Sequence, residues 1–171
     1  EIGELPVSLQ VKLLRVLQEN EIRRVGDSAS MPVNVRIVAA TVRNLAEEIK
    51  TGQFREDLYY RLNVLPIELP PLRDRRTDIT LLATHFLNRF NDVFGTQLTG
   101  FDDKATHLLN TYDWPGNVRE LENAVERAVA LADGSIIIEA DLPPKVRDSQ
   151  DRIKQSLQTD ELSIKKTVRI V

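Results

Sequence analysis

Two consecutive prolines, Pro70 and Pro71, divide this sequence into parts with different hydrophobic patterns. Proline lacks a backbone N–H and disfavours helical geometry in the residue before it, so neither a helix nor a central strand continues easily through the pair. Before the prolines, β-branched runs alternate with short helical patterns, whereas apolar residues after them recur only at helical spacing. We therefore expect a subdomain boundary here, with an α/β part before it and an all-α part after it.

The first part combines helical patterns with two extended runs. The spacing of leucine and valine predicts a helix over residues 7–17 that is buried on more than one side, and Asn44 is suited to cap a later helix. Residues 33–41 form a β-branched run with little charge, which is typical of a strand covered on both faces of a parallel sheet. Residues 64–69 predict a second strand, in which Pro66 favours an edge position.

The second part predicts three helices around one small core. Gly134 is a natural end for the third helix, since glycine adopts the left-handed conformation at little cost. The polar segment after Pro143 and Pro144 is typical of a linker, and residues 162–171 could begin another helix. The apolar positions at helical spacing are Ile79, Leu82, Ala83, Phe86, Leu87, Phe90, Ala105, Leu108, Leu109, Val118, Leu121, Val125, Ala128 and Val129.

Composition excludes several classes of protein. The net charge is −3 over 171 residues, whereas a general nucleic-acid binder needs a basic surface. The absence of cysteine excludes disulfides and thiolate metal sites, and the two isolated histidines, His85 and His107, do not make a metal site. The longest apolar runs are far shorter than the roughly 20 residues of a membrane span, and the first residues do not resemble a signal peptide. We expect a cytoplasmic protein and a chain that is truncated at both ends.

Four short motifs carry a resemblance to a known family. They are Glu-Ile-Gly-Glu-Leu-Pro at 1–6, Phe-Arg-Glu-Asp-Leu-Tyr-Tyr-Arg-Leu at 54–62, Pro-Pro-Leu-Arg-Asp-Arg at 70–75 and Trp-Pro-Gly-Asn-Val-Arg-Glu-Leu at 114–121. Together they resemble the later half of the AAA+ ATPase domain of bacterial enhancer-binding proteins, the activators of sigma-54 RNA polymerase. The resemblance covers roughly residues 1–146.

This resemblance implies an α/β fold, namely the C-terminal part of a P-loop-type AAA+ parallel-sheet core followed by an all-α lid subdomain. The core half would occupy residues 1–72, the lid residues 73–147, and a linker toward a further domain residues 148–171. The implied cofactors of the complete domain are ATP and Mg2+, with the main metal ligands upstream of this chain and none within it.

The resemblance also implies catalytic roles for three residues. Glu1 matches the glutamate that activates the attacking water. Arg61 matches the arginine finger that reaches the nucleotide of a neighbouring subunit, and Arg55 matches a second arginine at that interface. An arginine in this role stabilises the negative charge of a transferring phosphoryl group. From the residues alone, the two arginines could equally be solvated or paired with Glu56 and Asp57.

Arg119 is a candidate phosphate contact on physical grounds. Asn117 is suited to be the N-cap of the third helix, and Glu120 completes a capping-box pattern. Arg119 would then be the second helical residue, beside the positive end of the helix dipole, where a cation is unfavourable unless an anion such as phosphate offsets the cost. The resemblance assigns this position to sensor II. The alternative is an arginine paired with Asp113 or Glu122.

The resemblance places two further residues beside the nucleotide. Thr41, at the end of the expected strand 33–41, matches the polar sensor I, although Val42 stands where family members often have asparagine. Val118 precedes the sensor II arginine in the same motif.

Other parts of the family's machinery are missing from this sequence. The nearest approach to a P-loop is a pair of glycines, Gly95 and Gly100, which Phe101 rather than lysine follows. The polymerase-contacting loop with its Gly-Ala-Phe-Thr-Gly-Ala signature is absent, as is any convincing helix-turn-helix. We therefore expect that this chain alone neither hydrolyses ATP efficiently nor binds DNA specifically.

For the complete protein, the resemblance implies a homo-oligomeric ring assembled through the face that carries Arg55 and Arg61. Its ATP hydrolysis would remodel sigma-54 RNA polymerase holoenzyme, and DNA would be bound only through a separate domain, which is often Fis-like in this family. Two alternatives remain open. One is the AAA+ module of another machine, such as a clamp loader or protein unfoldase, and the other is a helical protein-interaction module that binds no nucleotide.

Overall fold

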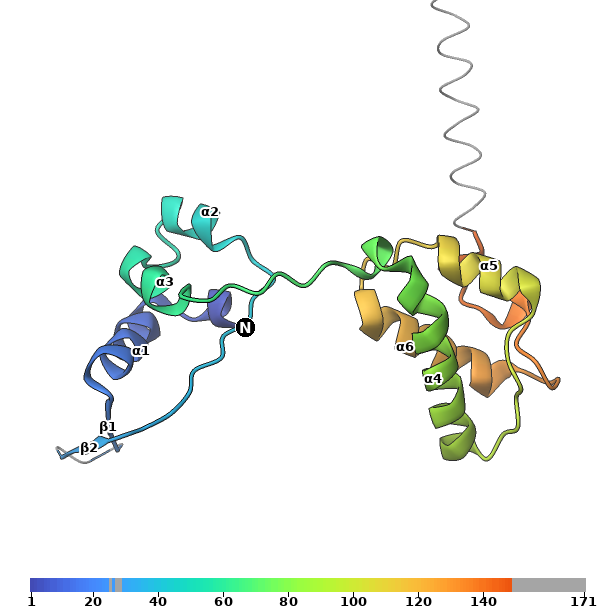
Figure 1. Cartoon of the computed structure of the whole chain (residues 1–171), viewed down its shortest axis with the longest axis horizontal. Coiled ribbons are helices and arrows are strands. Elements are labelled where there is room, and N and C mark those ends of the chain that lie inside the picture. The colour runs from blue at the N-terminus through green and yellow to red at the C-terminus, as the bar shows by residue number, and fades with distance from the viewer. Residues whose placement is uncertain (25, 27–28, 149–171) are drawn as a thin grey trace, which may run out of the picture. The chain divides into compact units, whose positions relative to one another are not determined.

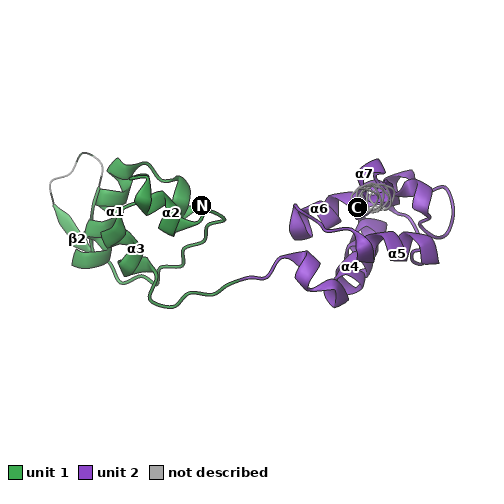
Figure 2. Ribbon diagram, turned by 90° about the horizontal axis from the view of Figure 1, so that it is seen from above, with its two compact units in different colours: residues 1–68 green, residues 69–171 purple. Residues whose placement is uncertain are grey.

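The computed structural model describes residues 1–24, 26 and 29–148, and it divides into two compact units, Glu1–Glu68 and Leu69–Val171 (Figure 2). The division falls beside the two prolines that mark the change of pattern in the sequence. The helix expected over residues 162–171, and all but the first residue of the expected linker, lie outside the described residues.

Unit 1 is built from short helices and a small hairpin (Figure 1). Its buried centre is formed by Leu14, Phe54 and Leu58, where one helix packs on another. In the hairpin, antiparallel pairing places Ile22 opposite Met31. The elements are the 3-10 helix η1 (Ile2–Glu4), α1 (Val7–Glu19), β1 (Glu21–Arg23), β2 (Ser30–Pro32), α2 (Leu45–Lys50) and α3 (Glu56–Leu62).

Two helices of unit 1 confirm the sequence prediction. Asn44 caps α2, since its side-chain oxygen accepts the N–H of Ala46 at 3.1 Å. The helix expected over residues 7–17 is α1, but it is not buried on more than one side. Leu14 is buried, whereas Val7 and Leu9 are 41% and 43% exposed, because no described residue covers that face.

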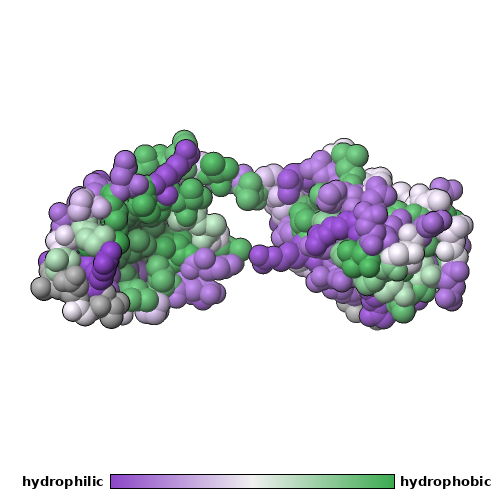
Figure 3. Space-filling view, turned by 90° about the horizontal axis from the view of Figure 1, so that it is seen from below, coloured by the Kyte–Doolittle hydropathy of each residue, from purple (hydrophilic) through white to green (hydrophobic). Residues whose placement is uncertain are grey.

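The two extended runs of unit 1 are not paired into a parallel sheet. Within the described residues the one sheet is the antiparallel pair β1–β2, so residues 33–41 and 64–69 are not strands there. A strand is defined by a ladder of hydrogen bonds to a neighbouring strand, and the described residues contain no strand beside these runs, which have only isolated backbone bonds such as Val33 N–H to the Asn20 carbonyl. Their side chains are consequently exposed, to 85% at Val38, and Figure 3 shows hydrophobic surface gathered on unit 1.

The regular structure of unit 2, over its described residues 69–148, is helical apart from an isolated bridge between Phe101 and Ile137. Every apolar position predicted from helical spacing is buried or packs against the buried core, which confirms the three-helix prediction. The elements are η2 (Leu72–Asp74), α4 (Arg76–Phe94), α5 (Asp103–Thr111), α6 (Asn117–Leu131), η3 (Glu139–Asp141) and α7 (Pro144–Arg147). No helix in the described ranges has the length and apolar character of a membrane span.

The end of α6 differs from the sequence prediction. The helix stops at Leu131, and Ala132 continues in an extended conformation against the core, so Gly134 is not a left-handed cap. The left-handed glycine of unit 2 is Gly95, whose φ of 69° ends α4. The extended exit from α6 leads the chain to Ile137, which is fully buried.

Candidate functional site

The turn that enters α6 holds two non-glycine residues in the left-handed backbone region. Trp114 has φ 48° and Asn117 has φ 52°. Such a conformation is rare for a bulky side chain, and it persists only where surrounding contacts hold it. Trp114 is fully buried, and its indole N–H donates to the carbonyl of Leu109 at 2.8 Å. Held strain of this kind is often found at functional sites.

The capping of α6 corrects the sequence prediction. Gly116, not Asn117, is the N-cap, and the side-chain oxygen of Asn117 accepts the distant N–H of Leu72 at 2.9 Å. The predicted role of Glu120 in the capping is confirmed, since its carboxylate accepts a hydrogen bond from the N–H of Gly116, at the start of the helix, at 2.7 Å. A glycine is needed there, because a Cβ at position 116 would lie 2.8 Å from the Cβ of Glu120. Arg119 is therefore the third helical residue, still within the first turn.

The bond between Asn117 and Leu72 gives a stability prediction. Asn117→Gly loses the acceptor for the Leu72 N–H and is expected to cost about 1 kcal/mol. Asn117→Ala loses the same bond and must also hold φ at 52°, which adds about 1 kcal/mol for a non-glycine residue. Urea unfolding followed by fluorescence measures unit 2 directly, because Trp114 is the single tryptophan of the chain. Equal stability of the two variants would show that the left-handed backbone is not retained.

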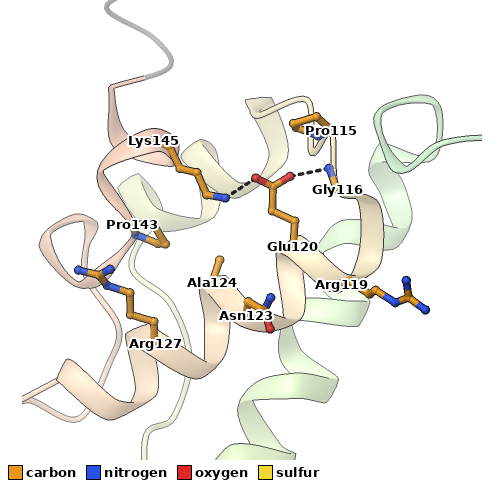
Figure 4. A pocket seen from close by; sticks show the side chains of 9 residues that line it. All are labelled: Pro115, Gly116, Arg119, Glu120, Asn123, Ala124, Arg127, Pro143 and Lys145. Carbon is orange, nitrogen blue, oxygen red and sulfur yellow. Dashed lines mark hydrogen bonds and ion pairs between the residues drawn. The ribbon is translucent and has the colours of Figure 1, made fainter.

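A shallow, open pocket lies along α6 beside this turn (Figure 4). At its centre the Glu120 carboxylate accepts a hydrogen bond from the Lys145 ammonium at 2.6 Å, which joins α6 to α7. Burial raises the pKa of the Glu120 carboxyl, but the bonds from Lys145 and Gly116 outweigh it, so the pKa lies below its ordinary value. The pocket is lined by Pro115, Gly116, Arg119, Glu120, Asn123, Ala124, Arg127, Pro143 and Lys145.

Arg119 is exposed, and its side chain points away from the Glu120–Lys145 pair (Figure 4). Its expected acidic partners are both engaged elsewhere, since Asp113 pairs with Arg76 at 2.9 Å and Glu122 pairs with Arg89 at 2.7 Å. Among the described residues, the Arg119 guanidinium has neither a hydrogen bond nor an ion pair. The site thus presents an unpaired cation at the positive end of a 15-residue helix, where an anion is favoured. Val118, beside it, is half-buried against the core.

Unit 1 brings the segments of Glu1 and Thr41 together. The N–H of Ile2 donates to the carbonyl of Ala40 at 2.9 Å, so the start of η1 lies beside the end of the extended run. Gly3 permits this approach, because a Cβ there would come within 2.7 Å of the Thr41 hydroxyl. That hydroxyl accepts the N–H of Arg43 at 3.1 Å, and the Glu1 side chain is exposed.

The two arginines around α3 have different partners. Arg55, the N-cap residue, forms a bidentate salt bridge with Asp57, with N–O distances of 3.0 and 2.6 Å. The hydrogen bonds of this pair raise the pKa of Arg55 and lower the pKa of Asp57. Arg61, in the last turn of α3, donates instead to the carbonyl of Leu17 at 3.1 Å. Arg61 therefore has no carboxylate partner among the described residues.

Sequence reasoning missed two connecting residues, Gln10 and Lys145. Gln10 is fully buried within α1, and two of its three hydrogen bonds reach residues more than 40 positions away. The sequence does contain an indication of this role, because Gln10 is a polar residue among the apolar positions predicted to be buried in that helix. Lys145 lies in the polar segment after Pro143 and Pro144, whose composition is typical of a linker, but the structure places its first residues in the helix α7. No local pattern connects Lys145 to Glu120.

Family models match both parts of the chain. The model of the sigma-54 interaction domain matches residues 1–68, and the model of the AAA+ ATPase lid domain matches residues 73–159. These matches agree with the motifs on which the resemblance in the sequence was based.

Individual proteins give the same result. Regulatory protein AtoC of Escherichia coli is 53% identical over 147 residues, which cover 86% of this chain and 32% of AtoC. Transcriptional regulatory protein ZraR of Salmonella typhimurium is 56% identical over 143 residues, 84% of this chain and 32% of ZraR. The chain thus spans about a third of the length of these curated relatives.

A solved structure supports the fold. The structure of NtrX from Brucella abortus in complex with ATP matches with a TM-score of 0.82 and 36% identity, over 87% of this chain and 35% of NtrX. Together with the lid match, this confirms the predicted fold class, the later part of an AAA+ core followed by an all-α lid.

Proposed function

Because this chain belongs to the AAA+ ATPase domains of bacterial sigma-54-dependent transcriptional activators, we propose that it is the later half of such a domain. Residues 1–72 would be the end of the core, residues 73–147 the lid, and the residues after them a linker. In the complete protein this domain binds and hydrolyses ATP, and it remodels sigma-54 RNA polymerase holoenzyme so that the promoter opens. The chain alone is not expected to do this, since its sequence contains no P-loop.

The observation that carries this proposal is the guanidinium of Arg119, which has no hydrogen-bond or ion-pair partner among the described residues. Arg76 and Arg89 occupy the two carboxylates that would otherwise neutralise it. A phosphate group of ATP supplies the missing negative charge and accepts charge-assisted hydrogen bonds. Arg119 would therefore bind the nucleotide and report its state to the lid, with Val118 beside it. The NtrX match, which includes complexes with ATP and with ADP, supports a nucleotide as the ligand.

Unit 1 would supply the groups that act during hydrolysis. Glu1 would accept a proton from the attacking water, and Thr41, held beside the Glu1 segment, would contact the γ-phosphate. Arg61 would stabilise the charge that develops on the phosphoryl group in the site of a neighbouring subunit, with Arg55 at the same interface. Mg2+ would neutralise phosphate charge in the complete domain, and the described residues contain no cluster of three acidic or histidine side chains to hold it.

Arg119→Ala in the full-length protein tests the proposal. Loss of a charge-assisted phosphate contact is expected to weaken ATP binding about 10- to 100-fold, which corresponds to roughly 1.5–3 kcal/mol. Equilibrium binding of a fluorescent ATP analogue measures the change. Lys104→Ala is the control, since Lys104 is an exposed cation of unit 2 on α5 and is expected to leave binding unchanged. Unchanged affinity in the Arg119 variant would refute the phosphate contact.

A further inference from the structure

Gln10 is the one buried polar side chain in the part of the chain that the structure describes. Its side-chain amide donates to the carbonyl of Leu5 at 2.8 Å and to the carbonyl of Gln53 at 2.9 Å. Its side-chain oxygen accepts the N–H of Arg55 at 2.8 Å. One glutamine therefore satisfies three backbone groups from two segments of the chain that are far apart in the sequence.

These two segments carry the candidate catalytic residues of unit 1. Leu5 caps η1, the short helix that begins directly after Glu1. Gln53 and Arg55 lead into α3, and Arg55 is its N-cap residue. Gln10 thus joins the segment of the candidate water-activating glutamate to the start of the helix with the candidate arginine finger.

A second contact holds the other end of α3. Arg61 donates to the carbonyl of Leu17 at 3.1 Å, near the C-terminal end of α1. The helices α1 and α3 pack side by side (Figure 1). The N-cap of α3 is bonded to Gln10 and its last turn to Leu17, so α1 supports α3 at both ends. The Arg61 contact is exposed and reaches one backbone carbonyl, at 3.1 and 3.4 Å from two guanidinium nitrogens, whereas the buried Gln10 side chain bonds to three backbone groups. Gln10 is therefore the stronger of the two supports.

We propose that Gln10 is a positioning residue that fixes the arginines of α3 relative to the Glu1 segment of the same subunit. The inference rests on the proposed roles of Glu1, Arg55 and Arg61. In a ring, Glu1 serves its own subunit's nucleotide while Arg61 serves the neighbour's. Gln10 then connects two successive nucleotide sites, because a displacement of the Glu1 segment is transmitted through one side chain to α3.

Mixed rings of the full-length protein test this inference. Glu1→Gln subunits lack the catalytic base but keep their arginines, and Arg61→Ala subunits lack the finger but keep Glu1. Each variant alone is expected to be inactive, and a mixture to regain ATP turnover, because the first can donate Arg61 to the second. Adding Gln10→Met to the Glu1→Gln donor removes all three hydrogen bonds at nearly constant side-chain length. Since the donor's own site is already inactive, the mixture measures only its ability to present Arg61.

With the Gln10→Met donor, ATP turnover of the mixture is expected to fall about 10- to 100-fold, because small displacements of a catalytic group have effects of this size. The affinity of the donor subunit for ATP is expected to stay unchanged. Gln18→Met in the donor is the matched control, since Gln18 is an exposed glutamine of the same helix, and it is expected to leave turnover unchanged. Gln10→Glu keeps the acceptor for the Arg55 N–H but turns an acceptor oxygen toward the carbonyls of Leu5 and Gln53, so it should lower turnover as well. If circular dichroism shows that the methionine variant does not fold, the glutamate variant decides.

Two negative results have different meanings. Full turnover with a folded Gln10 donor variant would overturn the positioning role and leave the finger assignment intact. If the mixture of Glu1→Gln and Arg61→Ala subunits with Gln10 unchanged does not regain ATP turnover, the assignment of Arg61 as the finger is overturned. The inference about Gln10 is then overturned with it.

Discussion

Arg61→Ala in the full-length protein is expected to abolish ATP turnover while leaving ATP binding intact. The arginine would stabilise charge that develops only during phosphoryl transfer, so its loss should lower kcat by about 10^3-fold or more. The structural cost should be small, because the bond to the Leu17 carbonyl is exposed and a net hydrogen bond contributes about 1 kcal/mol. Steady-state ATPase assays and equilibrium nucleotide binding separate the two effects.

Arg61→Lys and Arg55→Ala sharpen this experiment. Lysine keeps the charge but not the planar fork of donors, so Arg61→Lys should remain strongly impaired. Arg55 is already held by Asp57 in a bidentate salt bridge, so Arg55→Ala is expected to lower turnover less than Arg61→Ala. Full turnover by Arg61→Ala would refute the finger role, and a larger loss in Arg55→Ala would transfer that role to Arg55.

The helices of unit 2 could be predicted because their positions depend on local spacing. Residues such as Ile79, Phe86 and Leu121 recur at helical intervals, and the same intervals place them on the buried faces of α4 and α6. The extended runs of unit 1 could be recognised by composition but not paired. Pairing depends on a second strand, and the pattern in residues 33–41 contains no information about where that strand lies.

The details of the candidate site depended on contacts between distant residues. The local sequence predicted Asn117 to be the helix N-cap. Its side-chain oxygen instead accepts a hydrogen bond from the N–H of Leu72, 45 positions away. The partners of Arg119 could not be predicted for the same reason. The sequence shows that Asp113 and Glu122 are near enough to pair with it. That these two carboxylates pair instead with Arg76 and Arg89 depends on the fold. By contrast, the Arg55–Asp57 pair spans two residues, and it was one of the alternatives considered from the sequence.

Trp114→Ala is expected to be the most destabilising single change in unit 2. The indole is fully buried, its ring meets Tyr112 edge-to-face with centroids 5.0 Å apart, and its N–H is bonded to Leu109. Truncation of a buried tryptophan to alanine typically costs about 3–5 kcal/mol, against a total domain stability of roughly 5–15 kcal/mol. Urea unfolding followed by far-ultraviolet circular dichroism measures the loss, since the variant contains no tryptophan.

Trp114→Phe and Leu81→Ala separate packing from the indole hydrogen bond. Phenylalanine keeps most of the buried ring but leaves the Leu109 carbonyl without its donor, so a smaller cost of about 1–2 kcal/mol is expected. Leu81 is 72% exposed on α4, and its truncation should change stability by no more than about 0.5 kcal/mol. Because Trp114 also holds the left-handed turn that leads to Arg119, the alanine variant should lose ATP affinity along with stability. Stability near wild type in Trp114→Ala would show that the turn and the α6 start are held by other contacts.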